Sequence, residues 1–225
     1  MAIKPILFNT EMVRAILDGR KTCTRRICKD ANEYVVPDMD FYNSEKRTYA
    51  VHNFADQEHT EKLSIAERTC PICPGDILYV RETWEHFDCC CCEGDEHGNC
   101  PKEPQKSVLD KHSYGCYMYR ATDEISGDAK WHPSIHMPKE AARIWLKVTD
   151  VSVERLQDIT SQGAWKEGAR CACLHPVPDC AGNKTAFIEI WNSTIKKPDI
   201  DRYGWDANPG VWVIEFERCE KPKGV

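Results

Sequence analysis

A tight turn followed at once by an apolar run is the feature that most constrains the fold. The turn is Pro74-Gly75-Asp76, and residues 77–84 after it read Ile-Leu-Tyr-Val-Arg-Glu-Thr-Trp, which is a strong strand pattern. Comparable runs predict further strands, at 4–8, through about 27, 117–121, 143–156 and 211–216. The chain therefore offers many short strands from which to build a sheet.

Short helices are expected between these strands. Residues 10–18 repeat apolar side chains at helical spacing, with Asn9 or Thr10 as the cap and Gly19 at the end. Residues 160–167 and 185–195 fit two more helices. Periodicity and turns alone support only a mixed α+β class. Within that class, many strands and few helices favour a small β-barrel with flanking helices.

Composition narrows the class of protein. At 225 residues and 41% hydrophobic content, the chain fits one large domain or two small ones with a real core. Its net charge of −6 means that nucleic-acid binding would need a local basic patch. No apolar run reaches the length of about 18 residues that spans a membrane. The first residues also lack the apolar stretch of a secretion signal, so we expect a cytosolic protein without a membrane span.

A basic corner at residues 19–26 is the first candidate site. It reads Gly-Arg-Lys-Thr-Cys-Thr-Arg-Arg, and it follows a predicted helix. Thr22, Cys23 and Thr24 favour extended backbone, so the corner leads from a helix into a strand, where functional residues are often found. The alternative is a solvated basic turn without a function.

The fourteen cysteines predict metal ligation or buried thiols if the protein is cytosolic, and a disulfide framework if it is secreted. Two local groups fit a structural zinc site of cysteines with one optional histidine. They are Cys89, Cys92 and Cys100 with Cys116 or His97, and Cys171, Cys173, His175 and Cys180. Free surface thiols are the alternative for both groups.

A third spacing, Cys70-x2-Cys73-x15-Cys89-x2-Cys92, also resembles a zinc site. The strand between its two pairs would hold them about 26 Å apart, so this set is rejected. Cys23 and Cys219 lie in strand patterns and are expected in the core.

Four further residues are candidates for substrate or nucleic-acid binding. Glu82 is either an ion-pair partner of a nearby arginine (Arg81, Arg120 or Arg143) or an acid in a cleft. Trp84 and Trp131 either stack on a nucleobase or pack in the core. His136 is either structural or catalytic.

Six segments, taken in order, resemble a known family. They are residues 19–26, 74–84, 119–121 (Tyr-Arg-Ala), 131–138 (Trp-His-Pro-Ser-Ile-His-Met-Pro), 156–160 (Leu-Gln-Asp-Ile-Thr) with Glu167-Gly168, and 208–216 (Asn-Pro-Gly-Val-Trp-Val-Ile-Glu-Phe). Together they resemble the ASCH domain family of phage or prophage type, a branch of the PUA-like β-barrels. The cysteine-bearing insertions, at about 28–69, 85–116 and 170–183, lie outside the resemblance.

The resemblance implies a single barrel domain over residues 1–225, with a cleft that binds RNA or a nucleoside. A small bacterial relative in that family is an amidohydrolase that removes the acetyl group from N4-acetylcytidine. Its catalytic lysine, threonine and glutamate correspond by motif to Lys21, Thr24 and Glu167. The location implied for a phage-encoded chain is the bacterial host cytoplasm.

These residue types suit amide hydrolysis. Thr24 would be the nucleophile, and Lys21 would be its base if neutral, which requires a pKa far below the usual value of about 10.4. Arg20 and Arg25 favour the neutral form of Lys21, whereas Glu167 opposes it. Arg26 or a backbone N–H would hold the oxyanion. Residues three apart on a strand point to opposite faces, so Lys21 and Thr24 meet only across a turn or bulge.

Three functions follow as hypotheses. The first is an amidohydrolase acting on an N4-acylated cytosine nucleoside. The second is a non-catalytic module that binds RNA or a modified nucleotide, to which the basic corner and the aromatic residues are equally suited. The third is a phage interaction protein whose loops are held by zinc.

Overall fold

The computed structural model describes residues 1–29, 35–54, 62–69, 71–88, 105–106, 114–124 and 130–224. The described residues form both strands and helices, and most strands follow one another without a helix between them, so the predicted α+β class is confirmed. The strands are β1 (Ile3–Leu7), β2 (Cys23–Ile27), β3 (Val35–Asn43), β4 (Thr48–Phe54), β5 (Lys62–Thr69), β6 (Ile77–Arg81), β7 (Trp84–Asp88), β8 (Gln105–Lys106), β9 (Tyr114–Tyr119), β10 (Trp145–Arg155) and β11 (Gly210–Cys219). The α-helices are α1 (Thr10–Leu17), α2 (Ser161–Lys166), α3 (Gly182–Thr194) and α4 (Ile200–Tyr203). Short 3₁₀ helices cover Ser134–His136, Lys139–Ala141, Leu156–Asp158, Lys197–Asp199 and Trp205–Ala207.

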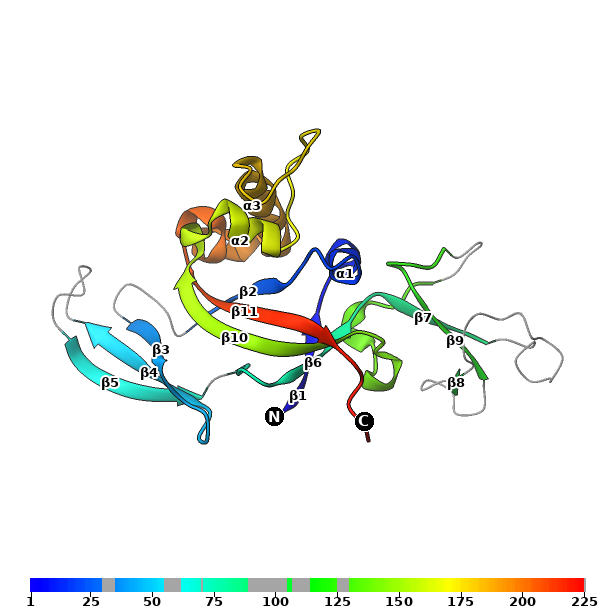
Figure 1. Ribbon diagram of the computed structural model, residues 1–225, viewed down its shortest axis with the longest axis horizontal. Coiled ribbons are helices and arrows are strands. Elements are labelled where there is room, and N and C mark those ends of the chain that lie inside the picture. Colours follow the sequence, from blue (N-terminus) through cyan, green and yellow to red (C-terminus); the bar gives the residue numbers. More distant parts are fainter. Residues whose placement is uncertain are drawn as a thin grey trace. The chain divides into compact units, whose positions relative to one another are not determined.

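The described strands form three sheets (Figure 1). The largest has the order β1-β6-β10-β11-β2, and the other two have the orders β3-β4-β5 and β7-β9-β8. Strand β1 pairs with β6 in parallel, with Ile6 opposite Val80. Strand β2 is at one edge of the largest sheet and pairs with β11 in antiparallel register, with Arg25 opposite Val213. The basic corner therefore leads into an edge strand.

By internal contacts the chain divides into two compact units. The first unit contains Met1, Asp18–Asp76 and Lys147–Glu217, and the second contains Ala2–Leu17, Ile77–Leu146 and Arg218–Val225. In the first unit, a buried cluster that includes Leu156, Phe187 and Trp191 joins α2 and α3. In the second unit, a cluster that includes Trp84 and Trp145 forms the core.

The predicted start and end residues of α1 and α2 are confirmed. The Asn9 side chain accepts a hydrogen bond of 2.9 Å from the N–H of Met12, so Asn9 is the cap of α1. The Thr160 hydroxyl accepts one of 2.9 Å from the N–H of Gly163 at the start of α2. Gly19 and Gly168 follow the two helices at φ of 71° and 87°, a backbone conformation that other residues rarely adopt.

Two segments differ from the expected pattern. The predicted strand 77–84 is interrupted, because the N–H of Glu82 donates to Met137 Sδ and β7 begins only at Trp84. For the insertion at about 28–69, the sequence pattern predicts a long surface segment with one hairpin. Its described part instead holds the three antiparallel strands β3, β4 and β5. None of the helices in the described ranges is both long and apolar enough to cross a membrane.

A buried ion pair anchors the turn at 74–76 in the first unit. The Asp76 carboxylate is fully buried and accepts two hydrogen bonds from Arg47, at 2.9 and 2.5 Å, and one of 3.2 Å from the N–H of Cys73. The backbone of the same turn bonds Val148 of β10 in both directions. The sequence-predicted turn is thus held by charge as well as by backbone hydrogen bonds.

We predict that Asp76→Ala lowers the free energy of unfolding by about 3 kcal/mol, because it leaves the Arg47 charge without its buried partner. Urea unfolding followed by circular dichroism measures this loss. Asp18→Ala is the matched control: its carboxylate also pairs with an arginine, Arg20, but the Asp18 side chain is 57% exposed. Asp18→Ala should lower the free energy of unfolding by at most about 0.5 kcal/mol. Equal losses for the two variants would contradict the prediction.

Candidate functional site

The basic corner is fixed beside the end of α2 by backbone hydrogen bonds. The N–H of Thr22 donates to the carbonyl of Lys166 at 2.9 Å, and the N–H of Phe216 donates to the carbonyl of Thr22 at 2.9 Å. These bonds bring Lys21 next to Glu167, which follows α2. Two residues that are 146 positions apart in the chain thereby become neighbours.

Lys21 and Glu167 form a buried ion pair. The Lys21 ammonium lies 2.5 Å from Glu167 Oε2 and donates a second hydrogen bond of 2.8 Å to the Glu167 carbonyl. The two side chains are only 2% and 7% exposed, so solvent weakens their attraction little. The structure thus joins two of the three residues that the family resemblance assigns to catalysis.

Arg25 extends this pair into a cluster of four charges. Its Nη1 lies 3.3 Å from Glu167 Oε1, so both oxygens of the Glu167 carboxylate face a cation. On its other side the Arg25 guanidinium contacts Glu154 of β10 at 2.6 Å. Two cations and two carboxylates balance within the cluster Lys21–Glu167–Arg25–Glu154, which is how a protein keeps such charges buried.

The electrostatic consequences differ between the two neighbouring arginines. Burial lowers the pKa of Arg25, but the Glu167 and Glu154 carboxylates outweigh that effect and raise it. Burial also lowers the pKa of Arg26, against a smaller opposing effect of Glu167. Arginine remains protonated in both environments, so both residues contribute fixed positive charge.

Thr24 lies on the opposite face of β2 from Cys23 and Arg25, because side chains alternate along a strand. The Thr24 side chain is buried, and its hydroxyl oxygen accepts a hydrogen bond of 2.6 Å from Arg26 Nη1. Arg26 is fixed in turn by a bond of 2.9 Å to the carbonyl of Arg25. The cation closest to the Thr24 hydroxyl among these contacts is therefore Arg26.

Arg20 and Cys23 complete the corner. Arg20 pairs with Asp18 at 2.8 Å at a partly exposed position, outside the buried cluster. Cys23 is 2% exposed, as expected for a core residue, and Arg25 Nη1 lies 3.8 Å from its sulfur. Burial raises the pKa of the Cys23 thiol to about 12, with Glu167 as the next contributor.

Two of the four candidates in the second unit, Glu82 and Trp84, take structural positions. Glu82 is 1% exposed and binds Arg143 through two hydrogen bonds of 2.9 Å, which is the predicted ion-pair interpretation. Trp84 is 1% exposed, with its ring 5.7 Å from that of Tyr117 and 5.2 Å from that of His132, so it packs in the core. Trp131 is half-buried and His136 is exposed.

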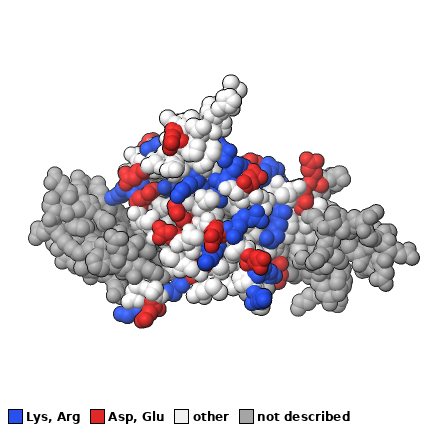
Figure 2. Space-filling view, in the orientation of Figure 1, with Lys and Arg blue, Asp and Glu red and all other residues white. Residues whose placement is uncertain are grey.

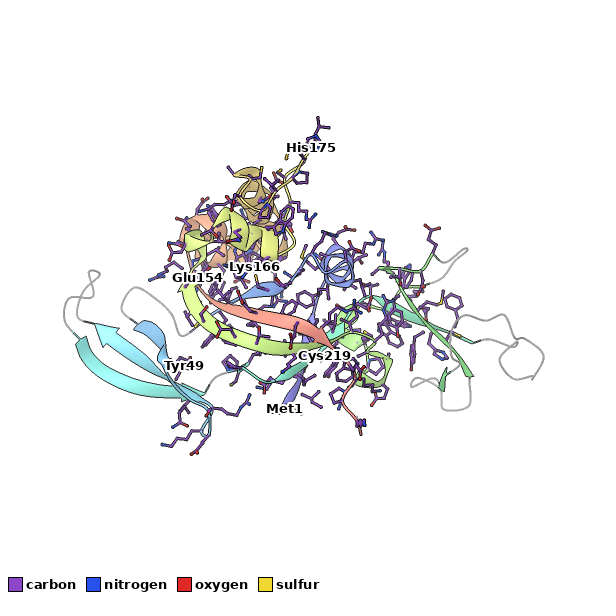
Figure 3. All side chains as sticks on the ribbon, viewed as in Figure 1. Met1, Tyr49, Glu154, Lys166, His175 and Cys219 are labelled. Carbon is purple, nitrogen blue, oxygen red and sulfur yellow. The ribbon has the colours of Figure 1, made fainter. Side chains whose placement is uncertain are left out.

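Three of the predicted metal ligands come together in the first unit. The sulfurs of Cys171, Cys173 and Cys180 all lie within 4.8 Å of one another, a group that could hold a metal ion. His175 is not in the group. It is exposed, and Figure 3 shows it at the outer end of the loop between α2 and α3.

The loop is built so that these sulfurs meet. Asn183 is fully buried; its side chain accepts a hydrogen bond of 3.0 Å from the N–H of Cys171 and donates to the carbonyls of Val177 and Pro178 at 2.8 and 3.1 Å. A side chain at Gly182 would place its Cβ 2.6 Å from Cys171 Cβ. The absence of a side chain there lets the start of α3 approach Cys171 closely.

The other predicted cysteine group lies largely outside the described residues. This applies to Cys89, Cys92 and Cys100, and also to the alternative ligand His97. Cys116 is described and is buried in β9. Cys219, expected in the core, is half-buried and packs against the cluster of the second unit.

Two features were missed by the sequence predictions. Glu154 was not a candidate, although the alternating pattern of β10 could have placed it on one face with other polar residues. A cavity of 270 Å³ near α4 is lined by Trp205, Asp201 and Asp206, among others. The sequence feature that could have indicated this cavity is the Gly204-Trp205-Asp206 run, which the sequence analysis did not consider.

Comparison of the chain with known protein families, with curated proteins and with solved structures gives no match in any of the three. The geometry of the chain's own residues is therefore the basis for any functional proposal.

We predict that, in protein stripped of metal by a chelator, Cys23 stays unmodified by a thiol-alkylating reagent at pH 8 while the exposed Cys173 reacts. A thiol with a pKa of about 12 has almost no reactive thiolate at pH 8, and the thiolate of Cys23 forms only as the pH approaches that value. Peptide mass spectrometry of protein labelled in the native state gives the measurement, with guanidinium-unfolded protein as the control in which both cysteines react. Equal native labelling at the two positions would contradict the prediction.

Proposed function

We propose that the chain is an ASCH-type amidohydrolase that deacylates N4-acylated cytosine nucleosides through Lys21, Thr24 and Glu167. The proposal rests on the six ordered motifs and on the buried pair between two of these three residues. We also propose that the sheet β1-β6-β10-β11-β2 belongs to a PUA-like barrel. The strands expected for that barrel near 4–8, 77–84, 143–153 and 211–218 correspond to β1, β6, β10 and β11 of this sheet. The strand expected at 117–121 falls instead in β9, which belongs to the sheet β7-β9-β8.

The observation that carries the proposal is the burial of Lys21. A lysine that binds nucleic-acid phosphates is typically exposed, because it must reach the phosphate and displace the counterions condensed on the nucleic acid. The Lys21 side chain is 2% exposed and its ammonium is occupied by Glu167. Buried, strongly interacting ionisable groups are enriched at catalytic sites, which favours chemistry over phosphate binding for this residue.

In the proposed mechanism the Thr24 oxygen attacks the acyl carbonyl carbon of the substrate. Lys21 passes its own proton to Glu167, which lies 2.5 Å away, and can then act as a base. To accept the Thr24 proton it must come within hydrogen-bond reach of that hydroxyl in the substrate complex, since the partner of the hydroxyl in this structure is Arg26. Arg26, at 2.6 Å from the Thr24 oxygen, stabilises the negative charge that develops on the tetrahedral intermediate. The cytosine amine then leaves with a proton from Lys21, and water releases the acyl group from Thr24 as a carboxylic acid.

Arg25 and Glu154 have a positioning role in this proposal. Arg25 holds Glu167 Oε1, which turns the Oε2 atom toward Lys21. Glu154 holds Arg25 from the other side and offsets its charge. Figure 3 labels Glu154 below the α2 region, on the strand that leads into it.

The alternative is non-catalytic binding of RNA or a modified nucleotide. Figure 2 shows Lys and Arg interspersed with Asp and Glu over the described residues of the face in view, so charges of one sign do not cover that face. The mixture agrees with the net charge of −6 and offers RNA no broad basic surface on this side. The binding hypothesis is therefore kept as an outcome of the following test.

We predict that Lys21→Arg lowers hydrolysis of N4-acetylcytidine by about 100-fold or more, because arginine keeps the charge but does not act as a base. Steady-state turnover measures this loss. Lys166→Arg is the matched control: Lys166 is 46% exposed and pairs with Glu215, so its turnover should equal that of the wild type.

The binding alternative predicts a different pattern. Wild-type protein would show no turnover, and Lys21→Arg would keep its RNA affinity. Lys21→Ala would then weaken salt-dependent RNA binding and reduce the salt slope by about one counterion. That set of results would overturn the amidohydrolase proposal.

We further propose that the metal held by Cys171, Cys173 and Cys180 is zinc, with His175 folding back to supply a fourth ligand. Thiolate sulfur and imidazole nitrogen in a tetrahedron are the ligands typical of structural zinc. The loop has few apolar contacts of its own, since Leu174 is 93% and Val177 53% exposed. A bound ion would supply the order that such a loop lacks.

We predict that Cys171→Ser and Cys180→Ser each lose one equivalent of zinc relative to the wild type. His175→Ala should retain the ion with about 10- to 100-fold lower affinity. Elemental analysis of protein purified without added metal measures the content, and competition with a chelator measures the affinity. Cys219→Ser is the control that should keep the wild-type amount, and equal zinc in all variants would refute the site.

A further inference from the structure

The strongest unassigned feature is the contact between two thiols in the loop that joins α2 to α3. Cys180 Sγ lies 3.1 Å from Cys171 Sγ, with the Cys180 thiol as donor. The metal proposal treats three sulfurs alike, but this pair is in direct contact. Because a disulfide bond is about 2.05 Å long, the two sulfurs need to approach by only about 1 Å to form one.

The approach of this pair is imposed by the surrounding backbone. Asn183 bonds both cysteines: its side chain accepts from the N–H of Cys171, and its own N–H donates to the carbonyl of Cys180 at 3.0 Å. The Cys180 N–H donates to the carbonyl of Val177 at 3.1 Å, which closes the turn before α3. Both sulfurs also lie 3.7 Å from the Cβ position of a side chain at Gly182, so that glycine leaves the space between them open.

The pair is more accessible than the buried cysteines of the described residues. Cys171 and Cys180 are half-buried, whereas Cys23, Cys28 and Cys73 are at most 2% exposed. Leu174, in the same loop, is 93% exposed. A small oxidant in solution can reach the pair without unfolding of the chain.

We propose that Cys171 and Cys180 are a redox-active pair that a small-molecule disulfide converts into an intramolecular disulfide. One cysteine attacks the reagent, RSSR, to form a mixed disulfide and releases the thiol RSH. The other cysteine then attacks the protein sulfur of the mixed disulfide and releases the second RSH. The two protein thiols are oxidised, the reagent is reduced to two thiols, and both protein protons leave with them.

This reaction competes with the proposed metal. A disulfide sulfur is no longer a thiolate ligand, so oxidation leaves Cys173 as the single thiol of the three. One thiolate does not complete a structural zinc site. Metal and disulfide are therefore alternative ways of closing the same loop, and oxidation of the loaded protein releases the ion.

The test uses the full chain in two forms, metal-free and loaded with zinc. Each is incubated with increasing ratios of oxidised to reduced glutathione, then quenched with an alkylating reagent and mapped by mass spectrometry. Because no Lys or Arg lies between them, Cys171, Cys173 and Cys180 fall in one tryptic peptide, residues 171–184. We expect this peptide to carry the alkyl group on Cys173 alone and to contain a Cys171–Cys180 link that makes it about 2 Da lighter than the form with both thiols reduced. In the zinc-loaded form the link should appear together with release of zinc to a colorimetric chelator.

Two variants make the test specific. Cys173→Ser keeps both members of the pair and should still form the link, whereas Cys171→Ser should leave Cys180 as a mixed disulfide with glutathione. The metal-free arm keeps the proposal independent of whether zinc is the bound ion and of whether Lys21 is catalytic. The proposal is overturned if Cys173 forms the link with either cysteine, or if Cys171 and Cys180 stay reduced when Cys173 already carries glutathione.

Discussion

The interaction on which the candidate site depends is the sharing of one buried carboxylate by two cations. Glu167 accepts from Lys21 on one oxygen and faces Arg25 on the other. Each cation comes from the segment around β2, and the carboxylate comes from the end of α2, so the attraction joins parts of the chain that are far apart in sequence. Removing one partner would leave an uncompensated charge in a region of low dielectric constant, which makes the three side chains interdependent. Glu154 completes the balance and allows the cluster to stay buried.

Local features of the fold could be predicted from the sequence because their causes are local. The caps at Asn9 and Thr160 and the glycines after α1 and α2 act within a few residues of where they lie. The interruption at Glu82 could not be predicted, since it depends on Met137 and Arg143, more than 50 positions away. The third strand after residue 28 was missed for a similar reason: pairing between β4 and β5 is a property of two segments rather than of either alone.

In the candidate site, too, local features could be predicted from the sequence, whereas contacts between distant segments could not. Lys21 and Glu167 were grouped only by the family resemblance, because no spacing rule links two residues that are 146 positions apart. Glu154 was overlooked because a carboxylate on an alternating strand is indistinguishable from a solvated one until its partner is known. Cysteine spacing correctly grouped Cys171, Cys173 and Cys180 but could not show that His175 lies outside the group, since a loop can direct its tip inward or outward.

The short connection from α2 to the cysteines has a mechanical consequence. Between Glu167 and Cys171 the chain has only Gly168, Ala169 and Arg170. The backbone of Gly168 and Ala169 is bonded back onto α2, and Ala169 is fully buried. Arg170 lies 3.8 Å from the ring of Trp165, which fixes the last residue of the connection as well. All three residues of the connection are thus held against α2, so little of its backbone is free to absorb a displacement of Cys171 before that displacement reaches Glu167.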